Sequence, residues 1–502
     1  MRLHQLLRLA IAACAAFIVI AAVSQYLFGV PIYANFTTYG VLLLACAFVY
    51  RIARPVRNQV ETIIRLGIAY ALLFAFLQRL VSLLYFPNTF GFSKPPDFEP
   101  LWVYTLPEFH RAILTYLVVV AIFLIGMKFA VRWRDGMHTN PPAHRYASLL
   151  STRRIIYVAA IAALALAQIL GAVMGWRMGS AVSWRWGWIV RLLPTSLFLV
   201  AMIILFFRHH AALTRGERTL TIGFLALFVV MSLAQGSRSG IVTFANLLIF
   251  GALIVYGNFY IPRRWVAWMA FGVVLLGPLF WGVGSMIRSS GIASGTFSFG
   301  WNDVILISRR FGIGFDDFIV VASGRWDHAI ASQYVTMRNI VGVAVNGSLP
   351  GDILSVPWEG FSLANVWIWI AWGERIWRQL PLHGEGWHTF SQFRMMWGLS
   401  IAMALTGCWA YVVARAFSWC QRRGTTFFLI VASSLLTEFT IEFFNGKNLD
   451  SMLNSILSLA AYFIVFALFI QFMDAIVRTA HSRNVHHAEA PALRVRGVGV
   501  PQ

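Results

Sequence analysis

The sequence predicts an all-α polytopic membrane protein of about twelve transmembrane helices, with a large periplasmic loop between the ninth and the tenth. The first observation is composition: 59% of the 502 residues are hydrophobic and only 12% are charged, which is too apolar for an ordinary soluble domain. The second is a succession of apolar windows of about 20 residues, the length that crosses a bilayer. The third is the placement of arginine and lysine, which favours alternate ends of these windows.

The apolar windows divide the chain into four parts, and we expect the windows at 32–50 and 219–235 to be the shortest spans. The predicted spans are 8–29, 32–50, 62–85, 112–131, 155–175, 188–207, 219–235, 240–257, 264–284, 395–414, 425–443 and 455–474. No small-x-small cleavage site follows the first window, so we expect a retained helix rather than a signal peptide. The four parts are the first nine helices (1–284), the loop (285–394), the last three helices (395–474) and a polar tail (475–502) expected to be disordered.

Positive charge orients the predicted helices. With the N-terminus placed in the cytoplasm, roughly 24 Lys and Arg and 5 Asp and Glu fall on the inner side, against 16 and 14 on the outer side. This bias predicts that both termini are cytoplasmic and that the loop is periplasmic. It also explains the net charge of +21, which therefore gives no reason to expect a nucleic-acid partner. Orientation does not explain the outer-side arginines, so these are the better candidates for function.

A six-residue turn from Gln235 to Gly240 joins the seventh and eighth helices on the predicted outer side. Arg238 follows Ser237 there, and Ser239 can cap the next helix, so free backbone N–H groups and a positive helix end accompany the guanidinium. Arg288, just after the ninth helix, falls at the same depth. Two such guanidinium groups could clamp a diphosphate. The alternative is that each contacts lipid headgroups.

The loop contains two further polar groups. Arg325 and Arg338 stand on either side of a Trp-Asp-His sequence that ends at His328, and are candidates for substrate binding. Near the end of the loop, Glu385 and His388 lie among glycines. Histidine titrates near neutrality, so His388 could be a general base toward a sugar hydroxyl, with Glu385 and His328 as alternatives. The competing interpretation for each residue is an exposed side chain without a function.

Three charges fall inside predicted spans. Arg79 lies in the third, and Glu438 and Glu442 lie four residues apart on one face of the eleventh. Charges at membrane depth usually pair with one another or line a cavity. For these residues we favour structural ion pairing over a functional cavity.

The chain resembles the bacterial O-antigen polymerase (Wzy) and O-antigen ligase superfamily. The matching features are about twelve helices with both termini inside, the Gly-Ser-Arg-Ser-Gly turn, the large outer loop, an arginine near the start of the loop (Arg288) and a histidine near its end (His388). The resemblance implies inverting transfer of a glycan from an undecaprenyl-diphosphate-linked donor at the periplasmic face of the inner membrane. Arg238 and Arg288 would then bind the diphosphate, and His388 would be the base.

The resemblance also implies that no metal or other cofactor takes part. The residues agree, because the first outer loop has no acidic residue and no His and Cys cluster has zinc spacing. In ligases the histidine is usually followed by Asn or Ser, whereas Thr389 follows here. The stretch from Leu349 to His388 is more similar to polymerases, so we expect a polymerase whose acceptor is the sugar of a second lipid-linked repeat unit.

Other functions remain open at this point. A ligase would use the same chemistry and transfer the glycan to lipid A core. A flippase or transporter of lipid-linked sugars belongs to a different class, and seldom needs an outer loop of about 110 residues. An acyltransferase with a thiol nucleophile is excluded, since no cysteine falls on the outer side. The expected partners are an undecaprenyl-diphosphate-linked oligosaccharide, the lipid bilayer and a chain-length regulator membrane protein.

Overall fold

The computed structural model shows an all-α fold in the part of the chain that it describes. The described residues are 1–85, 104–132, 195–209, 213–234, 238–267, 271, 315–324, 326–348, 356–357, 363, 366, 370, 388–424, 426–461 and 464. Within these ranges the only β structure is an isolated bridge between Arg2 and Tyr260. The all-α part of the predicted fold class is therefore confirmed for the described residues.

The predicted spans that fall on described residues are helical. In chain order the elements are α1 (Leu3–Phe28), α2 (Phe36–Ile52), α3 (Gln59–Leu72), π-helical η1 (Leu73–Leu77), α4 (Gln78–Tyr85), α5 (Leu106–Arg132), α8 (Thr195–His209), α9 (Arg215–Ala234), α10 (Arg238–Tyr256), α13 (His328–Tyr334), α14 (Met337–Ser348), α17 (Thr389–Arg423), α18 (Thr426–Leu436), π-helical η5 (Thr437–Ile441) and α19 (Glu442–Asn445). Residues 315–323 and 449–461 are helical as well. The predicted span 155–175 and most of 264–284 lie outside the described residues.

Five described stretches are long and apolar enough to cross a membrane. They are Leu3–Phe28, Gln59–Tyr85, Leu106–Val131, Thr389–Arg423 and Phe428–Asn445. Shorter apolar helices cover Phe36–Ile52, Phe244–Tyr256 and Leu449–Ala461. These helices are typical of a membrane protein. The number of about twelve spans and the periplasmic position of the loop stay predictions.

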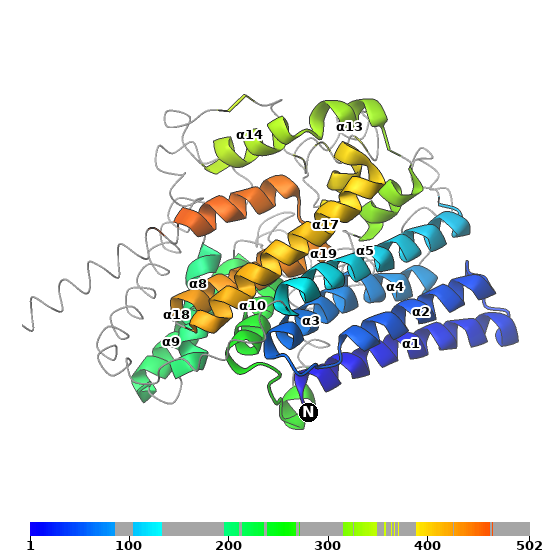
Figure 1. Ribbon diagram of the computed structural model, residues 1–502. Helices are drawn as coiled ribbons and strands as arrows, with labels where there is room; N and C mark the ends of the chain where they lie inside the picture. Colours follow the sequence, from blue (N-terminus) through cyan, green and yellow to red (C-terminus); the bar gives the residue numbers. More distant parts are fainter. Residues whose placement is uncertain are drawn as a thin grey trace, which may run out of the picture.

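The long helices lie side by side (Figure 1). α1 packs on α2, and α5 makes its most extensive contact with α17. α8, α9, α10 and α18 pack together. They lie on the side of α3 and α17 that is opposite to α1 and α2 (Figure 1). α13 and α14 lie at the top of the view, where α13 contacts α17 (Figure 1). The described part of the long loop therefore sits at one end of the helical bundle.

Contacts between distant segments agree with helices that run alternately up and down. At one end, the ammonium group of Met1 donates to the carbonyl of Ile261 at 2.7 Å. At the other end of α1 and α2, the hydroxyl of Thr38 lies 2.8 Å from Nε2 of His110, in the first turns of α5. Each contact joins segments that the sequence places on the same side of the membrane. The face that each end occupies remains a prediction.

α17 begins earlier than predicted and is broken inside. The sequence predicted a span over 395–414, whereas the helix extends over Thr389–Arg423 with His388 as its N-cap. Gly398 interrupts it with φ 80° and ψ 174°, a conformation that other residues rarely adopt. The break separates a short helix, 389–397, from the long part of α17. The residues that precede the predicted span are thus held in a folded segment.

Two π-helical segments, η1 and η5, interrupt the helices that carry the buried charges. η1 ends two residues before Arg79, and η5 contains Glu438. η5 packs against α3, where Gly67 lets Leu436 and Ile441 approach closely. A π-helical turn shifts the faces of the helix on either side of it, and such turns are frequent at functional sites. Neither π-helical segment was predicted from the sequence.

Gly126 should be required for the contact between α5 and α17. A β-carbon on Gly126 would overlap the backbone carbonyl of Gly407, which cannot move aside as a side chain can. We expect Gly126→Ala to lower the free energy of unfolding by about 1–3 kcal/mol, measured by denaturant titration in detergent. Gly40→Ala on α2 is the control, because an added β-carbon there would meet no atom of another segment within 4 Å. Equal stability of the two variants would contradict the close helix contact.

Candidate functional site

A buried ion pair joins the helical bundle to the long loop. Nε of Arg79 donates to Oδ1 of Asp316 at 2.9 Å, and both side chains are almost fully buried. Arg79 also donates through Nη1 to the hydroxyl of Ser82 at 3.0 Å. A charge pair at this depth avoids the desolvation that an isolated charge would suffer. Arg79 therefore takes part in an ion pair, as the sequence suggested, but its partner comes from the loop rather than from the eleventh span.

The loop segment 315–323 packs into the bundle around Tyr116. Phe315 and Phe318 lie with ring centroids 5.4 and 5.0 Å from that of Tyr116, and both meet it edge to face. Phe76 of η1 stacks on Tyr116 at 4.6 Å and also meets Phe315 edge to face at 4.9 Å. Asp317, which follows Asp316 in the chain, is also buried. From the sequence we expected 285–394 to be an outer loop with interfacial segments, and this buried helix was not predicted.

His388 lies in the same aromatic layer. Its side chain is 0% exposed, and its ring meets Tyr116, Phe318 and Phe443 edge to face at centroid distances of 5.4, 5.5 and 5.4 Å. Nδ1 accepts a hydrogen bond from the backbone N–H of Phe390 at 3.2 Å, which caps the start of α17. Burial lowers the pKa of His388, which precedes the span, to about 3. The ring is therefore neutral at pH 7.

The polar group around His328 is partly assembled. Asp327 does not hold the ring of His328, because its Oδ1 accepts from the N–H groups of Ala329 and Ile330 at the start of α13. His328 instead lies against Trp326, with ring centroids 4.5 Å apart. Arg338 is exposed and donates to the carbonyl of Pro357 at 3.4 Å. The structure thus keeps His328 and Arg338 at the surface of the loop, away from the buried layer of His388.

Several predicted site residues lie outside the described residues. These are Ser237, Arg288, Arg325 and Glu385. Arg238 is the first residue of α10, one position before the Ser239 cap that the sequence suggested. The backbone N–H groups at the start of α10 therefore begin at Arg238, where a helix end favours an anion. The diphosphate clamp remains a prediction about these residues.

Arg111 and Arg394 form a pair of cations that the sequence did not single out. The guanidinium carbon of Arg394 lies 5.8 Å from the ring centroid of Trp326, and Arg394 is close enough to Arg111 for their charges to interact. Within the described part of the chain, neither arginine forms an ion pair. The only signal in the sequence was their position at the predicted outer ends of two spans. An anion at this place would relieve the repulsion between them.

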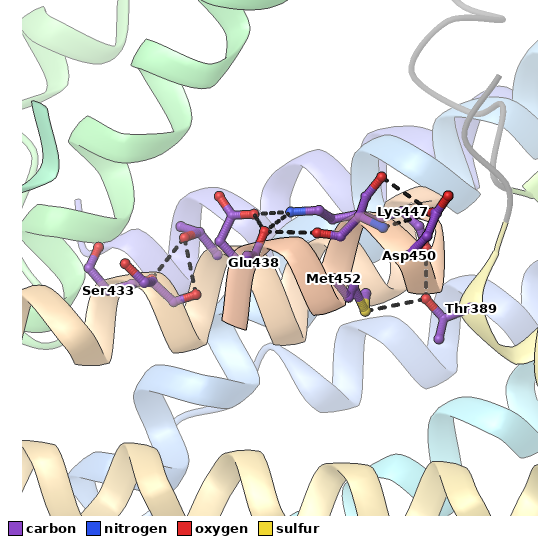
Figure 2. Close-up of polar contacts among 10 residues, drawn as sticks. Thr389, Ser433, Glu438, Lys447, Asp450 and Met452 are labelled. Atoms are coloured by element: carbon purple, nitrogen blue, oxygen red, sulfur yellow. Dashed lines mark hydrogen bonds and ion pairs between the residues drawn. The ribbon is translucent and has the colours of Figure 1, made fainter. Parts of the chain in front are cut away.

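Besides the aromatic layer around Tyr116, a row of polar side chains extends along α18, η5 and α19 to the start of α17 (Figure 2). Glu438 and Lys447 form an ion pair, and Lys447 also donates to the hydroxyl of Ser455 at 2.8 Å. The hydroxyl of Thr389 donates to the carbonyl of Lys447 at 2.7 Å. The eleventh span thus contains one of the ion pairs that the sequence favoured, with a lysine outside the span as partner. The row ties the first turn of α17, next to His388, to residues 447–455.

The same row holds another part of the long loop. Oδ2 of Asp450 accepts a hydrogen bond from the N–H of Leu363 at 3.1 Å. Within the loop itself, the carbonyl of Ile370 accepts from the N–H of Asp327 at 3.2 Å. Burial raises the pKa of the Asp450 carboxyl, while its backbone hydrogen bonds oppose that shift. The loop is therefore attached to the bundle through Asp316, Asp450 and His388.

In the described ranges, no three His, Cys, Asp or Glu side chains gather as a metal site would require. Metal-independent chemistry remains a prediction. No protein-family model, curated protein or solved structure matches the chain. A proposal about function therefore rests on the buried layer around Tyr116 and on the sequence features.

Proposed function

We propose that this protein is a polysaccharide polymerase of the bacterial inner membrane. It transfers a glycan from an undecaprenyl-diphosphate-linked donor to the sugar of a second lipid-linked repeat unit at the periplasmic face. The observation that carries the proposal is the attachment of the long loop to one end of the bundle, where Asp316, Arg79 and His388 are buried around Tyr116. Ionisable side chains are expensive to bury in apolar surroundings, so several that gather at one place are a candidate functional site.

The transfer needs few groups from the protein. A hydroxyl oxygen of the acceptor sugar attacks the anomeric carbon of the donor, and the bond from that carbon to the diphosphate oxygen breaks with inversion. Undecaprenyl diphosphate leaves with the electron pair, and the hydroxyl proton passes to a base. Arginines near the headgroup level would stabilise the growing negative charge on the leaving group. Arg238 and Arg288 are proposed for this role, and Arg325 and Arg338 for binding the glycan.

A flippase of lipid-linked oligosaccharides is the second candidate. The observation that favours it is the presence of charges within two membrane-spanning stretches, Arg79 in Gln59–Tyr85 and Glu438 in Phe428–Asn445. Transporters often place such charges along their substrate path. Purified protein in liposomes separates the two functions, because a polymerase joins two labelled repeat units and a flippase only moves them between leaflets.

The lipopolysaccharide of a deletion strain tests the proposal in the cell. A polymerase deletion should leave a single repeat unit on the lipid A core, since ligation still takes place. A ligase deletion should leave no repeat units on the core and should accumulate lipid-linked polymer. Restoration of the full ladder by the wild-type chain, and not by a chain that lacks residues 315–323, would support the proposed site.

Chelation should leave the transfer unchanged. The first outer loop has no carboxylate that could bind a metal next to the diphosphate, and arginines are proposed to hold that group instead. We expect in-vitro transfer by the purified protein to proceed at the same rate with and without EDTA. Inhibition by EDTA that Mg²⁺ or Mn²⁺ reverses would contradict this prediction and, with it, the arginine clamp.

A further inference from the structure

The two ring nitrogens of His388 have different surroundings. Nδ1 accepts the hydrogen bond from the N–H of Phe390 that caps α17. Nε2 is buried and has no hydrogen-bond partner among the described residues. The rings of Tyr116, Phe318, Phe443 and Phe444 surround it, each edge to face with the imidazole. The cap thus uses one nitrogen and leaves the other directed into an apolar site.

This arrangement decides where the proton of the ring resides. A neutral imidazole has one N–H and one lone pair, and a nitrogen that accepts a hydrogen bond must present the lone pair. Since Nδ1 accepts from Phe390, the proton is on Nε2. Nε2–H is therefore a donor and cannot take a proton from a sugar hydroxyl. Among the described residues this donor has no acceptor, and a buried donor is stabilised when an acceptor oxygen contacts it.

We propose that His388 donates a hydrogen bond through Nε2 to a phosphate oxygen of the lipid-linked donor, and that another group is the base. This inference rests on the proposed function and deepens it. A phosphate oxygen is the strongest acceptor that such a substrate carries, and it gains negative charge as the diphosphate leaves. A fixed donor in apolar surroundings stabilises that charge more than the ground state. Tyr116 and Phe318 would have to shift to admit the phosphate.

Two amide substitutions separate the functions of the two nitrogens. The amide of asparagine can take the place of Nδ1 and keep the cap, since asparagine is a preferred N-cap residue, but it does not extend to Nε2. The amide of glutamine extends to the position of Nε2 and can donate there, but it has no basic nitrogen. We expect His388→Gln to retain turnover within about tenfold of wild type, and His388→Asn to lose at least about a hundredfold. Thermal unfolding in detergent should show that His388→Asn is as stable as the wild-type protein.

The outcomes are exclusive. Equal loss of turnover in both variants would mean that the ring acts as a base, which overturns the proposal. Full turnover by a stable His388→Asn protein would mean that only the cap is needed, and overturns it as well. Labelled donor lipid binding is measured in parallel, and it should change less than turnover in His388→Asn because the contact strengthens in the transition state.

A nitrogen NMR spectrum tests the proton position without any activity. Protein labelled with ¹⁵N-histidine is compared with His388→Asn, so that the missing signals identify His388. A protonated Nε2 and an unprotonated Nδ1 are expected, and the opposite tautomer would overturn the inference. If the wild-type protein transfers no glycan, the proposed function fails, and the spectrum still decides the tautomer of His388.

Discussion

Replacing Asp316 by leucine should lower the free energy of unfolding by about 3–5 kcal/mol. The substitution leaves the guanidinium of Arg79 fully buried and without the carboxylate that it contacts at 2.9 Å. Removing one partner of a buried pair is more harmful than removing both, because the remaining charge stays desolvated. The double variant Arg79→Met with Asp316→Leu should therefore regain much of the lost stability. Denaturant titration of the detergent-purified protein measures all three proteins on one scale.

The pair between Glu61 and Arg65 is the matched control. These residues lie four apart on α3, their closest atoms are 3.4 Å apart, and both side chains are partly exposed. Glu61→Gln should change the free energy of unfolding by no more than about 1 kcal/mol. If Asp316→Leu has no larger effect than Glu61→Gln, or if the double variant is less stable than Asp316→Leu, the buried pair does not hold the loop on the bundle.

Apolar length and charge placement were sufficient to predict most of the helices. α2, α9 and α10 begin and end within four residues of the predicted spans, whereas α1 and α5 begin five and six residues earlier than predicted. Their caps are local in sequence, such as Asn35 accepting from the N–H of Thr38 and Asn58 from the N–H of Glu61. Local signals of this kind are visible without knowledge of the partners in space.

Contacts between distant segments could not be predicted in this way. The segment 315–323 is buried because its phenylalanines meet Tyr116 and because Asp316 meets Arg79, 237 residues away in the chain. Two adjacent aspartates are typical of an exposed position, although the rest of this run is mostly apolar. The π-helical segments η1 and η5 likewise depend on packing, and apolar periodicity does not distinguish them from regular helix.

For the candidate site, the sequence likewise indicated one residue but not its contacts. His388 was singled out from its residue type and from its position near the end of the loop, and the structure places it in a buried layer with Tyr116. Its use as a cap for α17 depends on where that helix begins, which the predicted span placed six residues too late. Residue type alone could not show which ring nitrogen is engaged. The base that accepts the hydroxyl proton is therefore sought elsewhere.

Replacing Arg238 by lysine should reduce turnover by about a hundredfold, nearly as much as replacement by alanine. Arg238 opens α10, where unpaired backbone N–H groups already favour an anion. A guanidinium presents two parallel N–H groups to phosphate oxygens, whereas an ammonium keeps the charge but offers no such fork. Negative charge grows on the diphosphate as it leaves, so one lost contact should raise the barrier by about 3 kcal/mol. Steady-state transfer between labelled lipid-linked repeat units measures this effect.

Arg264 provides the control for the clamp, because it is an exposed arginine that follows the opposite end of α10. Arg264→Lys and Arg264→Ala should transfer glycan at the wild-type rate, since the predicted orientation places this residue away from the donor diphosphate. Arg288→Lys should behave like Arg238→Lys if both guanidinium groups hold the same diphosphate. The losses of turnover in Arg238→Lys and Arg288→Lys should also combine less than additively in the double variant. The second substitution would act on a diphosphate that is already held less firmly. Wild-type turnover in Arg238→Ala, at normal expression, would exclude the residue from the clamp, and Arg111 and Arg394 would be the next pair to test among the described residues.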